Sequence, residues 1–92
     1  MTAGDDVTLK QLRAIAALST QRHFRRAAEE LGVTQPSLSA QIQNLESALQ
    51  VRLVDRARGG VSLTPVGREI VARARRILDE ERSMRDFAAT AK

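Results

Sequence analysis

The chain has 92 residues, no cysteine, one histidine and a formal net charge of +4. A chain of this length forms one small domain. The lack of cysteine excludes disulfides and thiol chemistry, and without the disulfides typical of small secreted domains nothing argues for secretion. No apolar run approaches the roughly 20 residues of a transmembrane helix, so we expect a cytoplasmic protein without a membrane partner. The positive charge favours a polyanionic partner, although charge alone does not separate nucleic acid from an acidic surface.

The first predicted helix follows an aperiodic tail of seven residues and runs from Thr8 to about Ser19. Thr8 and Gln11 have the spacing of a capping box, in which each side chain accepts a hydrogen bond from the other residue's backbone N–H. The residues expected on the buried side are Leu9, Leu12, Ile15, Ala16 and Leu18.

A second, short helix is predicted over residues 24–31, where the apolar residues have helical spacing. Gly32 can adopt the left-handed conformation that ends a helix. Arg25 and Arg26 fall in the first turn, where they oppose the positive end of the helix dipole. A phosphate partner would compensate for this, and two solvated arginines are the alternative. His23 has no companion metal ligand or nucleophile, so we expect a loop residue or a phosphate contact.

A third helix is predicted from Gln35 to Leu49, because Thr34 can cap it and Pro36 is tolerated in a first turn. One face carries the apolar residues Leu38, Ile42, Leu45 and Leu49 and belongs in a core. Only Gly32 and Val33 separate this cap from the preceding helix, and so short a connection predicts a helix-turn-helix.

The outer face of the third helix is uncharged, in a chain of which 28% of the residues are charged. Lys and Glu are the usual residues of a solvated helix face, whereas Ser and Asn weaken a helix. Short hydroxyls and amides can bond base edges in the major groove, and alanine suits a thymine methyl group. This pattern therefore favours a recognition helix, with an ordinary polar surface helix as the alternative.

After Leu49 the pattern predicts a strand at residues 52–56, a glycine-containing turn at 57–60 and a strand at 61–63. Together they form a two-stranded wing. Arg56 and Arg58 flank its tip, where wings of this kind place arginines against phosphates or in the minor groove. A solvated hairpin with basic ends is the alternative.

The last predicted helix has Thr64 as its cap and Pro65 at its first position, and it runs to about Phe87 without a helix breaker. Its length, on the order of 34 Å, exceeds what a small domain needs. An apolar stripe at coiled-coil spacing, interrupted by Glu81, predicts a homodimer through this helix. The expected dimer contacts are Ile70, Val71, Ala74, Ile77, Leu78, Met84 and Phe87.

The run FRRAAEELGVTQPSLSAQIQNLE, followed by LVDR and LTPVG, resembles the N-terminal DNA-binding domain of the LysR-type transcriptional regulators. The runs RHFRRAA and QPSLSAQI resemble the peroxide-sensing OxyR branch. Three residues depart from the family pattern: Ala40 stands where many members have Arg, Gln50 where most have Gly, and Val54 where Phe is usual. The first departure removes a common DNA contact, so no sequence preference can be carried over.

The resemblance implies a winged helix-turn-helix at residues 1–64 and a linker helix at 65–92 that pairs with that of a second copy. Full-length members are often tetramers, and they continue into an effector-binding domain that we expect to be absent from this chain. The expected fold is mainly α, with a two-stranded β wing and a long C-terminal helix. No cofactor, metal site or enzymatic activity is expected, because no catalytic constellation is present.

The sequence thus predicts a sequence-specific domain for double-stranded DNA that binds an inverted repeat as a homodimer. The alternative is a winged-helix module for protein or RNA contacts. The expected base contacts are Gln35, Pro36, Ser37, Ser39, Ala40 and Gln41. The expected backbone contacts are His23, Arg25, Arg26, Thr34, Gln43, Asn44, Arg56 and Arg58.

Overall fold

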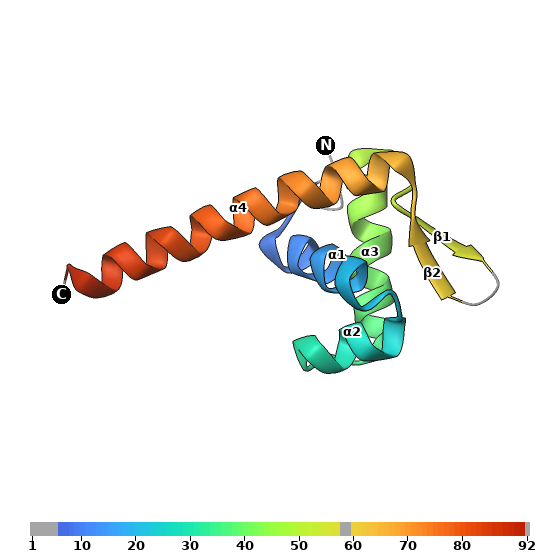
Figure 1. Ribbon diagram of the computed structural model, residues 1–92, viewed down its shortest axis with the longest axis horizontal. Helices are drawn as coiled ribbons and strands as arrows, with labels where there is room; N and C mark the ends of the chain where they lie inside the picture. The colour runs from blue at the N-terminus through green and yellow to red at the C-terminus, as the bar shows by residue number, and fades with distance from the viewer. Residues whose placement is uncertain (1–5, 58–59, 92) are drawn as a thin grey trace.

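The computed structural model describes residues 6–57 and 60–91, which form four helices and a two-stranded sheet (Figure 1). The elements are α1 (Leu9–Gln21), α2 (Phe24–Leu31), α3 (Gln35–Leu49), β1 (Val54–Ala57), β2 (Gly60–Leu63) and α4 (Pro65–Thr90). The long helix α4 lies along α1 with its first half, and its second half extends away from the other elements. The predicted fold, mainly helical with a wing and a long last helix, is confirmed.

The helices α1, α3 and α4 begin at the predicted caps. The backbone N–H of Gln11 donates to the Thr8 hydroxyl at 3.1 Å, and the Thr8 N–H donates to the Gln11 side chain at 3.0 Å. Thr34 and Thr64 accept from N–H groups in the first turns of α3 and α4, at 3.2 and 2.8 Å. Since each cap satisfies a donor that the helix leaves free, these short side chains define where the helices begin.

The core forms around α1, which packs against α2, α3 and α4. The largest fully buried side chains are Ile15, Leu18, Leu38, Ile42, Leu45 and Leu53. The predicted core face of α3 is thus confirmed, with Leu49 only partly buried. Two expectations for α1 were wrong: Leu9 is 36% exposed because it lies in the first turn, and Ala16 is only partly buried. Three helices surround α1, so Ala14 and Ala17 are buried as well.

The wing is an antiparallel pair in which Val54 lies opposite Leu63 and Arg56 opposite Val61. Its first strand begins two residues later than predicted. The Glu46 carboxylate of α3 accepts hydrogen bonds from the backbone N–H groups of Leu53 and Val54, at 2.7 and 3.3 Å. Because these are charge-assisted bonds from consecutive donors, they fix the base of the wing to α3.

The first half of α4 belongs to the core, which corrects part of the predicted dimer seam. Val71 and Ala74 are only 6% and 1% exposed, because they pack against the chain's own interior. They therefore offer no surface to a second chain. α4 also runs three residues past the predicted end at Phe87.

Gly67 brings α4 against the start of the wing. A Cβ atom at this position would lie 2.1 Å from the carbonyl oxygen of Leu53, which is a backbone atom that no rotamer change can move. Glycine is therefore required at position 67, where two backbones approach closely. With a larger residue there, α4 could not lie this close to the backbone of Leu53.

We predict that Gly67→Ala lowers the free energy of unfolding by about 3 kcal/mol, the upper end of the usual cost of overpacking. Helix propensity alone predicts the opposite sign, a gain of about 1 kcal/mol from Gly to Ala. Gly32→Ala is the matched control: its φ of 68° costs about 1 kcal/mol with any side chain, but no atom lies within 4 Å of the new Cβ. Urea unfolding at one protein concentration measures both, and a Gly67→Ala chain as stable as the parent would contradict the packing argument.

Candidate nucleic-acid interface

The exposed face of α3 is opposite its buried face, and it contains no charged residue from Gln35 to Leu45. Leu38, Ile42 and Leu45 are each 0% exposed and hold this helix against the core. On the other side the structure exposes Gln35, Pro36, Ser37, Ala40, Gln43 and Asn44, with Ser39 and Gln41 partly exposed. The burial pattern therefore brings the predicted base-contact residues together on one accessible surface.

The wing meets α3 through Arg56. Its guanidinium donates a hydrogen bond to the Ser39 hydroxyl at 3.0 Å and lies 4.5 Å from the ring centroid of Phe24. A groove of about 510 Å³ lies at this junction, and its lining consists of Phe24, Gln35, Pro36, Ser39 and Arg56. The wing, α2 and α3 thus form one continuous surface.

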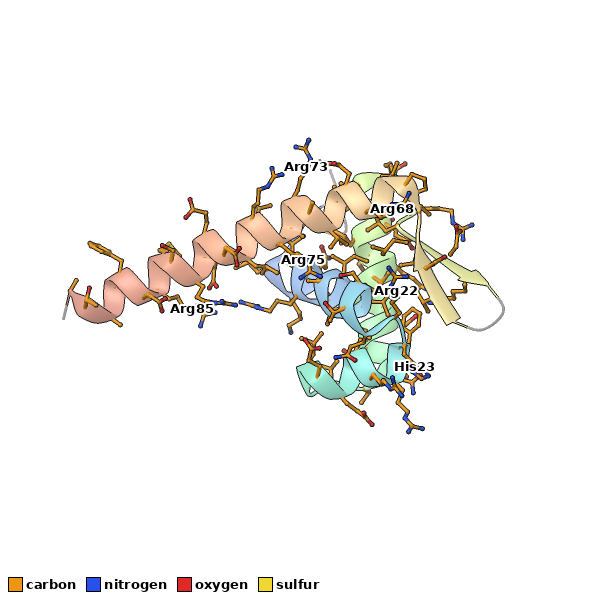
Figure 2. All side chains as sticks on the ribbon, in the orientation of Figure 1. Arg22, His23, Arg68, Arg73, Arg75 and Arg85 are labelled. Carbon is orange, nitrogen blue, oxygen red and sulfur yellow. The ribbon has the colours of Figure 1, made fainter. Side chains whose placement is uncertain are left out.

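Basic side chains surround this junction. A second groove, of about 520 Å³, is lined by Arg22, His23, Phe24, Arg25, Gln35, Arg56, Gly60 and Val61. Figure 2 shows Arg22 and His23 where α1 meets α2, on the side of the molecule that carries the wing. The structure therefore places three predicted backbone contacts together, namely His23, Arg25 and Arg56.

Arg22 is the residue of this groove that the sequence reasoning missed. It ends α1 in the left-handed conformation, with φ at 54°, and its side chain is exposed. A long basic side chain in that conformation has no simple sequence signal, because Gly or Asn is the usual residue there. Its position two residues before the next helix was the only available clue.

The start of α2 is suited to an anion. His23 occupies the cap position but makes no side-chain cap hydrogen bond, so the first N–H groups of this helix have no acceptor from their cap. Arg25 and Arg26 are exposed beside them, and the Arg25–Glu29 pair at 3.8 Å is a long contact between exposed groups. Free N–H groups, the positive end of the dipole and arginines together favour a phosphate at this point.

The predicted dimer contacts of α4 are not part of these grooves, and the predicted wing-tip contact Arg58 lies outside the described residues. Ile77 lies at the middle of α4, and Met84 and Phe87 lie on its far half; the three are 49%, 64% and 73% exposed. Ile70 and Leu78 are partly buried against the chain's own core.

A contact with α1 reaches the far half of α4. Glu81 accepts a hydrogen bond from Arg85 at 2.6 Å and lies 3.9 Å from Arg13 of α1. Closer to the core, the Arg75 guanidinium donates to the hydroxyls of Ser19 and Thr20 near the end of α1, at 2.8 and 3.0 Å, and Figure 2 shows Arg75 between α4 and α1. These contacts fix the direction in which α4 leaves the domain.

Comparison with known proteins matches residues 9–68 to the family described as bacterial regulatory helix-turn-helix proteins of the lysR family. The chain is 49% identical over 77 residues to an SDS degradation transcriptional activation protein of a Pseudomonas species. It is 39% identical over 83 residues to the DNA-binding transcriptional dual regulator OxyR of Escherichia coli. These matches cover 84% and 90% of this chain, but the chain spans only 25% and 27% of the two relatives.

Solved structures agree with the sequence matches. Full-length OxyR from Pseudomonas aeruginosa superposes with a TM-score of 0.91 at 41% identity, over 95% of this chain and 30% of that one. The DNA-binding domain of BenM in its complex with benA site 1 DNA superposes with a TM-score of 0.85 at 33% identity, over 91% and 94% of the two chains. The resemblance to the OxyR branch is confirmed as a similarity, although two relatives with other printed functions, the SDS degradation activator and a probable RuBisCO transcriptional regulator of Trieres chinensis, are each 49% identical to this chain. Among the described residues, no helix is both long and apolar enough to cross a membrane.

Proposed function

The chain belongs to the lysR family of bacterial regulatory helix-turn-helix proteins and is a DNA-binding domain of that type, and we propose that it reads a specific duplex sequence with α3 in the major groove. The family consists of transcription regulators, which confirms the expectation that the chain is not an enzyme. The observation that carries the proposal is the uncharged, accessible face of α3 opposite a fully buried one.

Base contacts are proposed for residues at the start of α3, because the N-terminal residues of a recognition helix enter the groove most deeply. Gln35 and Gln41 can bond bidentately to adenine, and Ser37 and Ser39 can bond several bases. Ala40 can contact a thymine methyl group. The proposed base contacts are Gln35, Pro36, Ser37, Ser39, Ala40 and Gln41.

Phosphate contacts are proposed for the basic groups around the groove between α2 and the wing. They would fix the register of α3 on the duplex without reading sequence. The proposed backbone contacts are His23, Arg25, Arg26, Thr34, Gln43, Asn44 and Arg58, whereas Arg56 is engaged with Ser39 of α3. Relatives solved with duplex DNA, such as BenM and CbnR, support this placement by their similarity.

Dimerisation is proposed through the middle and the far half of α4, since Ile77, Met84 and Phe87 form an exposed apolar stripe there. In Figure 1 the C-terminal end of α4 extends away from the other helices and strands of the described part of the chain. Ile70 and Leu78 flank the stripe and can contribute their exposed parts. Residues 65–92 would then act as a linker helix that joins two winged domains on an inverted repeat, with half-sites about one helical turn apart or a multiple of it.

Gln35→Ala should weaken binding to the selected duplex by about 1–3 kcal/mol, and weaken binding to random duplex DNA much less. Arg25→Ala is the matched control, because loss of a phosphate contact should weaken all sequences nearly alike. It should also reduce the salt slope by about one unit. Titrations across a salt series measure both effects. Equal losses on both duplexes for Gln35→Ala would exclude a base contact, and preference for single-stranded RNA would favour the alternative function.

Ile77→Asp should give a folded monomer, because Ile77 is half exposed and outside the core. Each fully buried Leu or Ile contributes ~1.5–3 kcal/mol, against an association cost of several kcal/mol, so we expect the parent chain to dimerise at about micromolar concentration. Ala72→Asp introduces the same charge at an exposed position off the stripe and should leave the dimer intact. Sedimentation at several concentrations decides this: a parent chain that is always monomeric, or an Ile77→Asp dimer, would exclude α4 as the dimer contact.

A further inference from the structure

Arg56 is engaged within the protein, although it lies on the exposed wing. Its Nη2 donates to the Ser39 hydroxyl at 3.0 Å, and its guanidinium carbon lies 4.5 Å from the centroid of the Phe24 ring. The two contacts together hold the guanidinium against Phe24 of α2 and Ser39 of α3. A cation over an aromatic face at this distance is attracted to it, so moving Arg56 out to a phosphate would break both contacts.

The contact with Arg56 also decides what Ser39 can offer to a ligand. A serine hydroxyl has one hydrogen to donate and two lone pairs. Arg56 occupies one lone pair, and in the part of the chain that the structure describes the Ser39 hydroxyl makes no other hydrogen bond. Because a guanidinium can only donate, the hydroxyl hydrogen must turn away from it. Ser39 is only partly buried, so this hydrogen is available on the face of α3.

We propose that Arg56 is a positioning residue for specificity, which holds the Ser39 hydroxyl as a hydrogen-bond donor toward an acceptor on a base edge. The proposal rests on the proposed function, in which α3 occupies the major groove. The acceptors offered there are N7 and O6 of guanine, N7 of adenine and O4 of thymine. A cytosine, which presents an amino donor at the same place, is disfavoured, because the hydroxyl oxygen already accepts from Arg56 and is a weaker acceptor for a second donor. This replaces the phosphate contact expected for Arg56 with an indirect role in base selection.

The electrostatics of α3 support this role. No charged residue of α3 itself lies on this face from Gln35 to Leu45, and the hydrogen bond from Arg56 to Ser39 brings a cation directly against it. A hydroxyl that accepts from a cation is a stronger donor, because hydrogen bonds in a chain polarise one another. The wing thus changes the chemistry of the recognition face as well as extending it.

The test uses a duplex that the parent chain selects from a random library, with each base pair then varied in turn. The variants are Ser39→Ala, Arg56→Ala and the double variant, with Arg25→Ala as the matched control for loss of an exposed arginine. Discrimination is the ratio of the affinities for the selected duplex and for a duplex with one base pair changed. Ser39→Ala and Arg56→Ala should each reduce this ratio about tenfold, at one and the same base pair. The double variant should lose no more discrimination than either single one, and Arg25→Ala should leave discrimination unchanged.

A second measurement reports the contact in the free protein. The Arg56 Nε–H proton should be shifted upfield by the Phe24 ring in the NMR spectrum, and Phe24→Leu should remove the shift and lower discrimination at the same base pair. An unshifted proton would overturn the proposal. The proposal would also be overturned if Arg56→Ala weakened binding to all duplexes to the same extent, and if its loss of binding free energy added to that of Ser39→Ala in the double variant. Both results leave the proposed function intact, whereas a parent chain that selects no sequence would overturn the proposed function and this inference with it.

Discussion

The packing of α3 against α1 is the constraint on which the other features depend. Leu38, Ile42 and Leu45 are completely buried, and full burial of such side chains contributes ~1.5–3 kcal/mol each. This contact fixes the rotation of α3 about its own axis, since a turn of the helix would expose these residues. The face with amides and hydroxyls is accessible for that reason, and not because helix propensity favours those residues.

The wing and α4 are attached to that packed pair by a few polar contacts and one close approach. Glu46 holds the N–H groups at the start of β1, while the Thr64 hydroxyl donates to the Arg52 carbonyl at 2.7 Å and also caps α4. Gly67 lets α4 lie against the backbone of Leu53. The position of the wing beside α3 and the position of the start of α4 thus follow from the same short region between residues 46 and 67.

Local signals in the sequence predicted the caps, the helix-turn-helix and the wing, because each depends on neighbouring residues. Contacts between distant residues could not be predicted in the same way. The apolar stripe of α4 has the same sequence pattern in its buried part, at Val71 and Ala74, as in its exposed part, at Ile77. The pattern therefore could not show which part packs against the chain's own core. The Arg56–Ser39 bond joins residues 17 positions apart and depends on the angle of the wing, which no local pattern specifies.

An NMR titration of the ¹⁵N-labelled chain with its selected duplex tests the central claim most directly, because it reports on every described backbone amide at once. If the uncharged face of α3 is the reading surface, the largest shifts will fall at residues 34–44, with further shifts at 22–26 and at Arg56. The far half of α4 will change little at a concentration where the chain is already dimeric. Shifts concentrated at residues 77–90, with those of α3 unchanged, would contradict the account.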